Sequence, residues 1–234
     1  MDSILDVRDL HVRYHDGTKA LRGVTLAVAR GERVALIGPN GSGKTSLLLA
    51  IMRAVPLAGE ITVDGVELTR ATQQQARGRC GMTFQSPDDQ LFMPTLLEDV
   101  AFGPLNQRMP ADQAAAAATS AIVAVGLSGL EARPAHHLSG GQKRQAALAT
   151  ILAMNVKLLL LDEPAESLDF RSRRRLMDIL AARAEAMLLA THDMDMVQRL
   201  CGRVIVLDEG LIAADGPTAA ILADKALLAA HGLA

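Results

Sequence analysis

The first sixty-odd residues show the short alternations of apolar and polar positions that are typical of β-strands. Such alternation covers residues 4–14 and returns at residues 24–28. A further strand is expected at residues 59–63, just before the tight turn Asp64-Gly65. We therefore expect the N-terminal region to form a β subdomain.

The middle of the chain, residues 87–154, has a different composition. Alanine, leucine and other helix formers dominate it, and prolines punctuate it. An alanine-rich stretch at residues 114–127 is too short for a membrane span and is expected to be an ordinary helix. This region is therefore predicted to be a helical subdomain inserted into the single domain of residues 1–234.

From residue 156 onward, apolar strands alternate with helices. The strands are expected at residues 156–161, 186–190 and 203–207, and the helices at residues 171–184 and 193–200. The apolar run at residues 33–37 is of the same kind, and a helix is expected at residues 44–54. Fully apolar strands separated by helices predict an α/β fold with a parallel sheet covered on both faces. A turn at residues 208–210, a returning strand and one or two small helices should end the chain.

A phosphate-binding loop is the strongest local motif. Residues 38–45 match the pattern G-x-x-x-x-G-K-[ST] between a predicted strand and a predicted helix. In such a loop the backbone N–H groups surround phosphates, the lysine reaches the β- and γ-phosphates, and the last hydroxyl binds Mg²⁺. The predicted nucleotide-binding residues are Gly38, Pro39, Asn40, Gly41, Ser42, Gly43, Lys44, Thr45 and Ser46.

Two carboxylates follow the predicted strand at residues 156–161. Asp162 is expected to hold Mg²⁺, directly or through water, and Glu163 to orient or deprotonate the attacking water. Acidic residues at the end of an apolar strand are often only turn or capping residues. Downstream of a phosphate loop, however, this pattern indicates nucleotide hydrolysis.

A second anion-binding helix start is predicted at Ser139. Ser139 is a good N-cap residue, and Gly140 and Gly141 remove side chains from the first turn. Since the chain already has one phosphate loop, the simplest ligand for this helix start is the γ-phosphate of an ATP held by another copy. A capped helix with a flexible entry is the alternative.

Together these motifs resemble those of the ATP-binding-cassette (ABC) family of nucleotide-binding domains, in the family's order and spacing over almost the whole chain. The resemblance implies a P-loop NTPase with a RecA-like parallel-sheet core, an N-terminal antiparallel β subdomain and an inserted α-helical subdomain. It also implies head-to-tail homodimers, in which each ATP lies between the phosphate loop of one copy and the signature residues of the other: Ser139, Gly140, Gly141 and Gln142.

The same resemblance implies roles for four single residues. Gln85 falls where the family contacts Mg²⁺ and water, and His192 where a switch histidine contacts the γ-phosphate. Asp169 matches an aspartate that crosses the dimer interface, and Tyr14 matches the aromatic residue that stacks on adenine. Catalysis would then depend on Glu163, His192, Gln85 and Lys44, and the Mg²⁺ ligands would be Thr45, Gln85 and Asp162. Taken alone, Tyr14 could be packing and His192 could begin a helix.

A finer resemblance is carried by residues 84–92 and 98–104, which are similar to the ATPases of energy-coupling-factor transporters, especially the cobalt/nickel branch. It implies integral membrane subunits as partners and a position at the cytoplasmic face of the membrane. Phe92, Met93, Leu96 and Leu97 would line the groove that receives a membrane subunit, or would belong to the core of the helical subdomain.

The chain departs from the family pattern close to these motifs. Ala165 and Glu166 stand where Thr and a small residue are usual, and Phe170 replaces a frequent proline. Gln145 occupies a position that is often arginine. We expect these changes to affect the details of the dimer interface rather than the chemistry.

Composition narrows the choice of partners. The net charge of −2 and the pI near 6.3 argue against a sequence-independent nucleic-acid binder. No signal peptide or membrane span is visible, so a membrane function would depend on other chains. Cys80 and Cys201 are far apart and show no metal-ligand spacing.

Several alternatives remain open from the sequence. The chain could serve another ABC importer or exporter, for a vitamin, an amino acid or another metal. It could also be a soluble ABC ATPase of DNA repair or translation, although those usually carry long insertions or two cassettes. A regulatory module without turnover would be expected to lack Glu163 or His192, and both are present. A heterodimer with a paralogue is an alternative to the homodimer.

Overall fold

The computed structural model describes residues 2–233. The chain forms two compact units. The first comprises Met1–Cys80, Lys157–Asp162 and Ala184–Ala234, and the second Gly81–Val156 and Glu163–Arg183. Each unit is described separately below.

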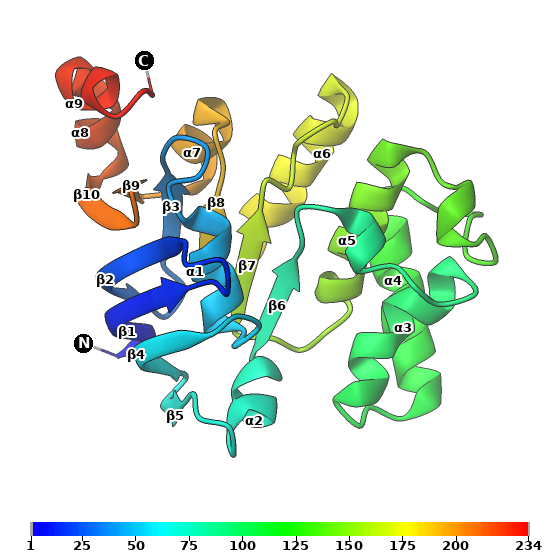
Figure 1. Cartoon of the computed structure of the whole chain (residues 1–234). Coiled ribbons are helices and arrows are strands. Elements are labelled where there is room, and N and C mark those ends of the chain that lie inside the picture. The colour runs from blue at the N-terminus through cyan, green and yellow to red at the C-terminus, as the bar shows by residue number, and fades with distance from the viewer. Residues whose placement is uncertain (1, 234) are drawn as a thin grey trace. The chain divides into compact units, whose positions relative to one another are not determined.

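The first unit begins with an antiparallel sheet of order β2-β1-β4-β5 (Figure 1). Its strands are β1 (Ser3–Arg13), β2 (Lys19–Ala29), β4 (Leu57–Val63) and β5 (Val66–Glu67). Leu5 of β1 pairs with Val28 on one side and Val63 on the other. All three are buried, which is the one-sided burial that their alternating pattern predicts. The predicted β subdomain is therefore confirmed as an antiparallel sheet.

The second sheet of this unit is largely parallel. Its strands follow the order β10-β9-β3-β8-β7, with β3 parallel to both β8 and β9, and β10 antiparallel to β9. Their bounds are β3 (Arg33–Ile37), β7 (Leu158–Asp162), β8 (Ala186–Ala190), β9 (Arg203–Asp208) and β10 (Leu211–Pro217). β6 (Cys80–Thr83) crosses from the first unit to the second. Every residue of β7 and β8 is buried, as the apolar runs at residues 158–161 and 186–190 predict, and the buried residues include Asp162 at the end of β7.

Helix α1 (Lys44–Ile51) lies between the two sheets. It packs against β1 and β2 of the antiparallel sheet and against β7 of the parallel sheet. Its side chains Leu47, Leu48 and Ile51 are fully buried. The helix ends three residues before the predicted residue 54, because Arg53 adopts φ +50°. The start of α1 is therefore held by core packing on both sides.

The remaining helices of the first unit are short. They are α2 (Gln73–Arg77), α7 (Met194–Leu200), α8 (Thr218–Ala223) and α9 (Lys225–Ala230). The two small helices predicted at the C-terminal end are thus present. His231 Nδ1 lies 2.7 Å from Asp208 Oδ2, which joins the end of α9 to the end of β9.

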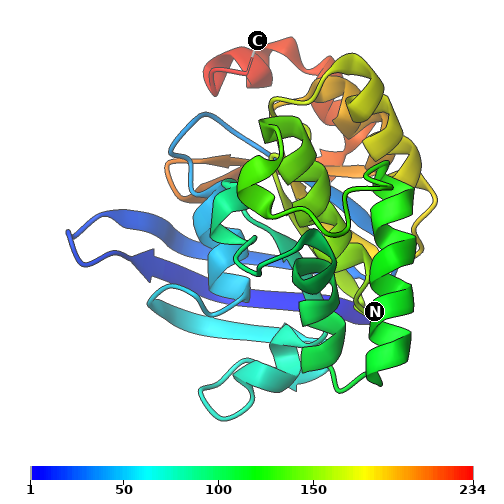
Figure 2. The same cartoon turned by 90° about the vertical axis from the view of Figure 1, so that its right-hand side faces the viewer.

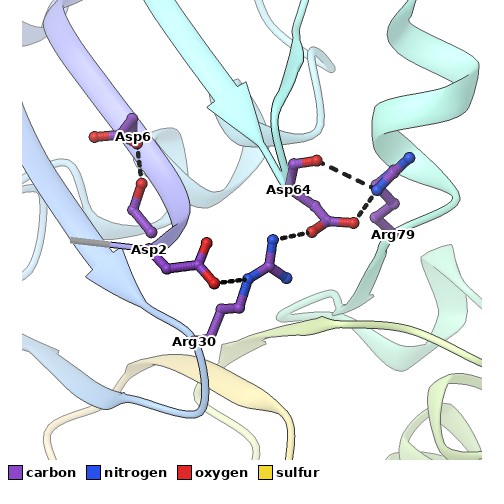
Figure 3. A network of polar contacts seen from close by, with 6 residues as sticks. Asp2, Asp6, Arg30, Asp64 and Arg79 are labelled. Carbon is purple, nitrogen blue, oxygen red and sulfur yellow. Dashed lines mark hydrogen bonds and ion pairs between the residues drawn. The ribbon is translucent and has the colours of Figure 1, made fainter.

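A polar network joins three turns of the first unit (Figure 3). Arg30 binds Asp2 through Nε at 2.9 Å and Asp64 through Nη2 at 2.6 Å. The Asp64 carboxylate also pairs with Arg79, which stands just before β6. Because Asp64 is shared by two arginines and is largely buried, this network is expected to stabilise the β4–β5 turn more than an isolated surface pair would.

The second unit is helical (Figure 2). It contains α3 (Leu96–Asn106), α4 (Ala111–Val125), α5 (Gly140–Leu152) and α6 (Phe170–Ala181), with the 3-10 turns η1 (Pro87–Asp89) and η2 (Ala135–His137). Helices α3, α4 and α5 pack on one another, and α6 packs on α4. The buried face of α4 carries Ala114, Ala118, Ala121, Ile122 and Val125. Small alanine side chains on this stripe allow close helix packing without large aromatic residues.

Candidate functional site

The predicted phosphate loop connects β3 to α1 in the first unit. Gly43 has φ +109°, and a Cβ there would lie 2.6 Å from Ala20 O. Only glycine therefore fits at this point. Gly41 also has a positive φ, of +80°, but a Cβ there would meet nothing within 4 Å. One end of the loop is thus packed against the protein, and the backbone at Gly41 is open to a ligand.

Lys44 directs its ammonium group back into this loop. Nζ donates to Gly38 O at 2.7 Å and to Pro39 O at 3.0 Å. Ser42, a residue of the same loop, is buried, and its Oγ has no hydrogen-bond partner within the described part of the chain. A buried hydroxyl without a partner costs free energy that a polar ligand would recover. The loop therefore combines a cation, an unsatisfied hydroxyl and open backbone, which suits an anion.

Tyr14 follows β1 and lies beside the first turn of α1. Its hydroxyl is 3.0 Å from Ser46 Oγ, and the side chain is half-buried. The structure thus brings together two predicted nucleotide-binding residues that are 32 positions apart in the sequence. Adenine stacking by Tyr14 stays a prediction.

Three predicted site elements lie at one edge of the parallel sheet. In the pairing of β3, β8 and β7, Leu36 stands opposite Ala190, which stands opposite Asp162. The carboxyl ends of these strands therefore meet, and ligands of open α/β sheets bind at such an edge. The phosphate loop follows β3, His192 follows β8, and Asp162 is the last residue of β7. Asp162 is buried and His192 is exposed.

In the second unit, Arg144 contacts the backbone of two predicted site residues. Its Nη1 donates to Glu163 O at 2.8 Å, and its Nη2 lies 3.3 Å from Gln85 O. Glu163 has φ +45°, a conformation that L-residues seldom adopt. The sequence patterns do not single out Arg144, because it belongs to no recognised motif and its contacts join segments distant in the sequence.

The signature residues form the start of α5 as predicted. Ser139 is the N-cap: its Oγ accepts from Gln142 N at 3.3 Å, and Gln142 Oε1 accepts from Ser139 N at 2.9 Å. A Cβ at Gly140 would meet nothing within 4 Å, and one at Gly141 would meet only ordinary contacts with the loop at residues 167–168. Because the Ser139 hydroxyl accepts in this cap, its own proton remains available for donation to a ligand.

Asp169 caps the next helix, α6. Its Oδ1 accepts from Ser172 N at 2.7 Å, and this hydrogen bond holds the pKa of the carboxyl below its ordinary value. The group therefore stays ionised near neutral pH. Gln145 Nε2 donates to Ser172 Oγ at 3.4 Å, so one of the departures from the family pattern contacts this helix start. Phe170, another departure, is 76% exposed.

An apolar surface lies at the segment after Gln85. Phe92 is 62% exposed and meets Phe102 edge to face, with ring centroids 5.0 Å apart. Buried Asp99 fixes this segment by accepting from Phe92 N and Met93 N at 2.9 and 2.8 Å, and its burial raises the pKa of its carboxyl. Leu96 is fully buried, so for this residue the core interpretation is right and the groove interpretation is wrong. Met93 and Leu97 are half-buried.

Comparisons with known proteins agree with these elements. The model of the ABC transporter family matches residues 21–166. SCO3161 of Streptomyces coelicolor, provisionally named an ABC transporter ATP-binding protein, is 48% identical over 98% of this chain and 88% of its own length. This chain belongs to the ABC transporter family.

Other members of the family are also similar. The energy-coupling factor transporter ATP-binding protein EcfA of Methanothermobacter thermautotrophicus is 41% identical over 96% of this chain and 74% of its own length. The structure of cbiO1 from Clostridium perfringens, described as part of the ABC transporter complex cbiONQ, is 34% identical, with a TM-score of 0.81 over 100% of this chain and 96% of that chain.

A solved dimer completes the comparison. The ATP-binding cassette MJ0796, dimeric in a post-hydrolysis state with ADP and Pi, is 25% identical, with a TM-score of 0.84 over 92% of this chain and 98% of that chain. The predicted ABC-type fold and ATPase activity are therefore confirmed, and the chain is the ATP-hydrolysing subunit of an ABC transporter. No helix among the described residues is both long and apolar enough to cross a membrane.

Proposed function

We propose that this ATPase powers an energy-coupling-factor importer for cobalt or nickel ions. The observation that carries the proposal is the similarity to cbiO1 over the full length of this chain. The similarity to EcfA and the two sequence runs at residues 84–92 and 98–104 support it. The proposed location is the cytoplasmic face of the membrane, where integral membrane subunits would hold the chain.

The exposed pair Phe92 and Phe102 is the proposed contact for a membrane subunit. Two aromatic side chains in edge-to-face contact form a rigid apolar surface, and exposed apolar surfaces of this kind favour protein partners. Asp99 fixes the backbone of Phe92, so this surface is already ordered before a partner binds. A helix of the membrane subunit is the proposed occupant.

For ATP binding, the first unit supplies the phosphate loop and Tyr14. We propose that the β- and γ-phosphates take the place of the Gly38 and Pro39 carbonyls as partners of the Lys44 ammonium group. The hydroxyl of Ser42 and the backbone at Gly41 would contact the phosphates, while Tyr14 would leave Ser46 and stack on adenine. His192, exposed at the same edge of the sheet, would contact the γ-phosphate.

The donor types also suit Mg²⁺. The Thr45 hydroxyl, the Asp162 carboxylate and the Gln85 amide oxygen are the hard oxygen ligands that this ion prefers. When bound, Mg²⁺ would neutralise the charge of the phosphates. Glu163 is the proposed residue that orients or deprotonates water, and His192 and Gln85 would complete the surroundings of the γ-phosphate.

A second copy of the chain is the proposed partner for the signature. Among the described residues, packing does not require glycine at position 140, because a Cβ there would meet open space. Close approach of a group from outside the chain would explain why glycine stands at this position. We propose that Ser139, Gly140 and Gly141 of one copy contact the ATP of another, with Asp169 at the interface. ATP would then close the homodimer, and hydrolysis would open it.

Purification of the tagged protein from native membranes tests the transport proposal. Integral membrane subunits should co-purify, and cells that lack the protein should lose uptake of radiolabelled cobalt or nickel. The double variant Phe92→Ala/Phe102→Ala should lose the membrane subunits while keeping the ATPase activity of the isolated protein. Leu211→Ala, which removes a comparably exposed apolar side chain from β10, is the matched control.

Two outcomes would contradict this proposal in different ways. If no membrane protein co-purifies, the soluble ABC ATPase becomes the better interpretation. If membrane subunits co-purify but uptake of both metals is normal in cells without the protein, the chain serves another importer or an exporter.

A further inference from the structure

We propose that Arg144 is a positioning residue that holds Glu163 in its working conformation from the signature helix. The inference rests on the proposed role of Glu163 in directing the attacking water. Arg144 lies on α5, five residues after the N-cap Ser139, and its side chain is only 12% exposed. It does not need to touch ATP to affect hydrolysis.

The geometry joins three segments of the second unit through one guanidinium group. Nη1 donates to Glu163 O at 2.8 Å, and Nη2 lies 3.3 Å from Gln85 O and 3.2 Å from the Glu166 carboxylate. Arginine suits this arrangement because its donors form a rigid planar fork. A lysine at this position would have a single nitrogen to serve three acceptors.

The contact with Glu163 matters most because the backbone there is strained. Glu163 adopts φ +45°, which costs a non-glycine residue free energy and persists only when its surroundings hold it. Its carbonyl accepts from Arg144 and also from Glu166 N at 3.1 Å. Two donors therefore fix the peptide plane after Glu163, and with it the direction in which its side chain leaves the backbone.

The loop of Gln85 has a second support that does not involve Arg144. Gln90 Oε1 accepts from Phe84 N at 3.2 Å, and Gln90 Nε2 donates to Ala147 O of α5 at 2.9 Å. Loss of the Arg144 side chain should therefore disturb Glu163 more than Gln85.

Glu166 gives Arg144 a counter-ion. A largely buried cation needs partners for its charge, and Glu166 supplies a carboxylate at 3.2 Å. This pairing accounts for an acidic residue at a position where the family usually has a small one. Glu166→Ala should leave both carbonyl contacts of Arg144 in place and reduce hydrolysis less than Arg144→Ala does.

Steady-state ATPase kinetics on the full chain test the inference. Arg144→Ala should lower kcat by about 10- to 100-fold, because a small displacement of a catalytic group is costly, while ATP affinity stays within about threefold. Arg144→Lys should recover part of the rate. Lys143→Ala is the matched control: it removes one positive charge from the neighbouring position, and its partner Asp88 is exposed, so kcat should stay within about twofold.

A double variant separates positioning from a general structural role. If Arg144 acts through Glu163, then adding Arg144→Ala to Glu163→Gln should not reduce the residual rate further. A further loss as large as that of the single variant would overturn the inference, as would a kcat for Arg144→Ala within twofold of the unaltered protein. If Arg144→Ala does not fold, Arg144→Lys decides: reduced kcat at unchanged ATP affinity supports positioning, and unchanged kcat overturns it.

The two proposals fail in distinguishable ways. Normal turnover by Glu163→Gln would remove Glu163 from its proposed role, whatever Arg144 does. An inactive Glu163→Gln protein together with a fully active Arg144→Ala protein would overturn only the positioning role of Arg144.

Discussion

Helices α1 and α5 both begin with glycines that suit an anion, but their surroundings differ. At α1, a Cβ at Gly43 would collide with Ala20 and Leu21, and no side chain caps the helix start. At α5, Ser139 and Gln142 form a complete capping box, and Gly140 faces open space. The start of α1 is therefore uncapped and sterically confined at Gly43. The start of α5 is capped by its own side chains and is unconfined at Gly140.

This difference indicates where the ligand of each helix start comes from. The start of α1 combines the Lys44 ammonium group with a loop whose backbone is open at Gly41, both within one chain, so it can bind phosphate without help. The start of α5 has a complete capping box on an open surface, so an anion carried by another copy can approach its glycines closely from outside. We therefore expect α1 to govern nucleotide affinity and α5 to govern association.

The largest effect is expected for Glu163→Gln, which tests whether nucleotide joins the two helix starts. Removal of the proposed base should lower kcat by about 10²- to 10⁴-fold, while ATP remains bound. ATP should then hold α1 of one copy against α5 of another, and size-exclusion chromatography with ATP should show a dimer. A strictly monomeric species under these conditions would count against the intermolecular role of α5.

Lys44→Ala tests only the phosphate site at the start of α1. Loss of a charged hydrogen-bond donor to phosphate should weaken ATP binding by about 10- to 100-fold, as measured by titration with a fluorescent nucleotide. Thermal unfolding without nucleotide shows separately how much the hydrogen bonds of Lys44 to Gly38 O and Pro39 O stabilise the loop. Unchanged affinity would show that the phosphates do not occupy this loop.

Two glycine substitutions test the contrast directly. Gly43→Ala should lower the free energy of unfolding by about 2 kcal/mol or more, because it forces a side chain into a left-handed conformation and against the Ala20 carbonyl. Gly140→Ala should change it by no more than about 0.5 kcal/mol, yet reduce ATP-dependent dimerisation. Equal destabilisation by both variants in denaturant titrations would remove the distinction between the two helix starts.

The smallest effect is expected for Ser139→Ala. Loss of the N-cap should cost about 1 kcal/mol in the free energy of unfolding, and Ser139→Thr should preserve most of it. The corresponding position at α1 is glycine and has no side-chain cap to lose. A Ser139→Ala protein as stable as the unaltered one would show that the capping box contributes nothing in solution.

Local patterns in the sequence predicted much of this molecule. The predicted strands at residues 33–37 and 186–190 have the observed bounds, because fully buried strands must be continuously apolar. Ser139 caps α5 as expected, since capping depends on residues within one turn. Helix α6 ends at Ala181 rather than at the predicted residue 184. No glycine or proline marks its C-terminus in the sequence, so the local pattern does not fix this boundary.

The contacts of single side chains could not be predicted from local sequence patterns. The sequence left open whether Leu96 lies in a groove or in the core, because its burial depends on which helix faces meet. The structure places it in the core. The pairing of Arg144 with Glu166 and the partnership of Tyr14 with Ser46 join residues 22 and 32 positions apart, which no local pattern encodes.

The sequence by itself determined the two glycine-rich helix starts and the order of strands and helices, because each depends on residues within a few positions of one another. The order and spacing of such local motifs along the chain determined the family. Only the tertiary structure decided that Gly43 is confined while Gly140 is open, and that one buried arginine reaches the backbone of both Glu163 and Gln85. Space around a residue and distances between remote segments arise when the chain packs, so they are properties of the fold rather than of any motif.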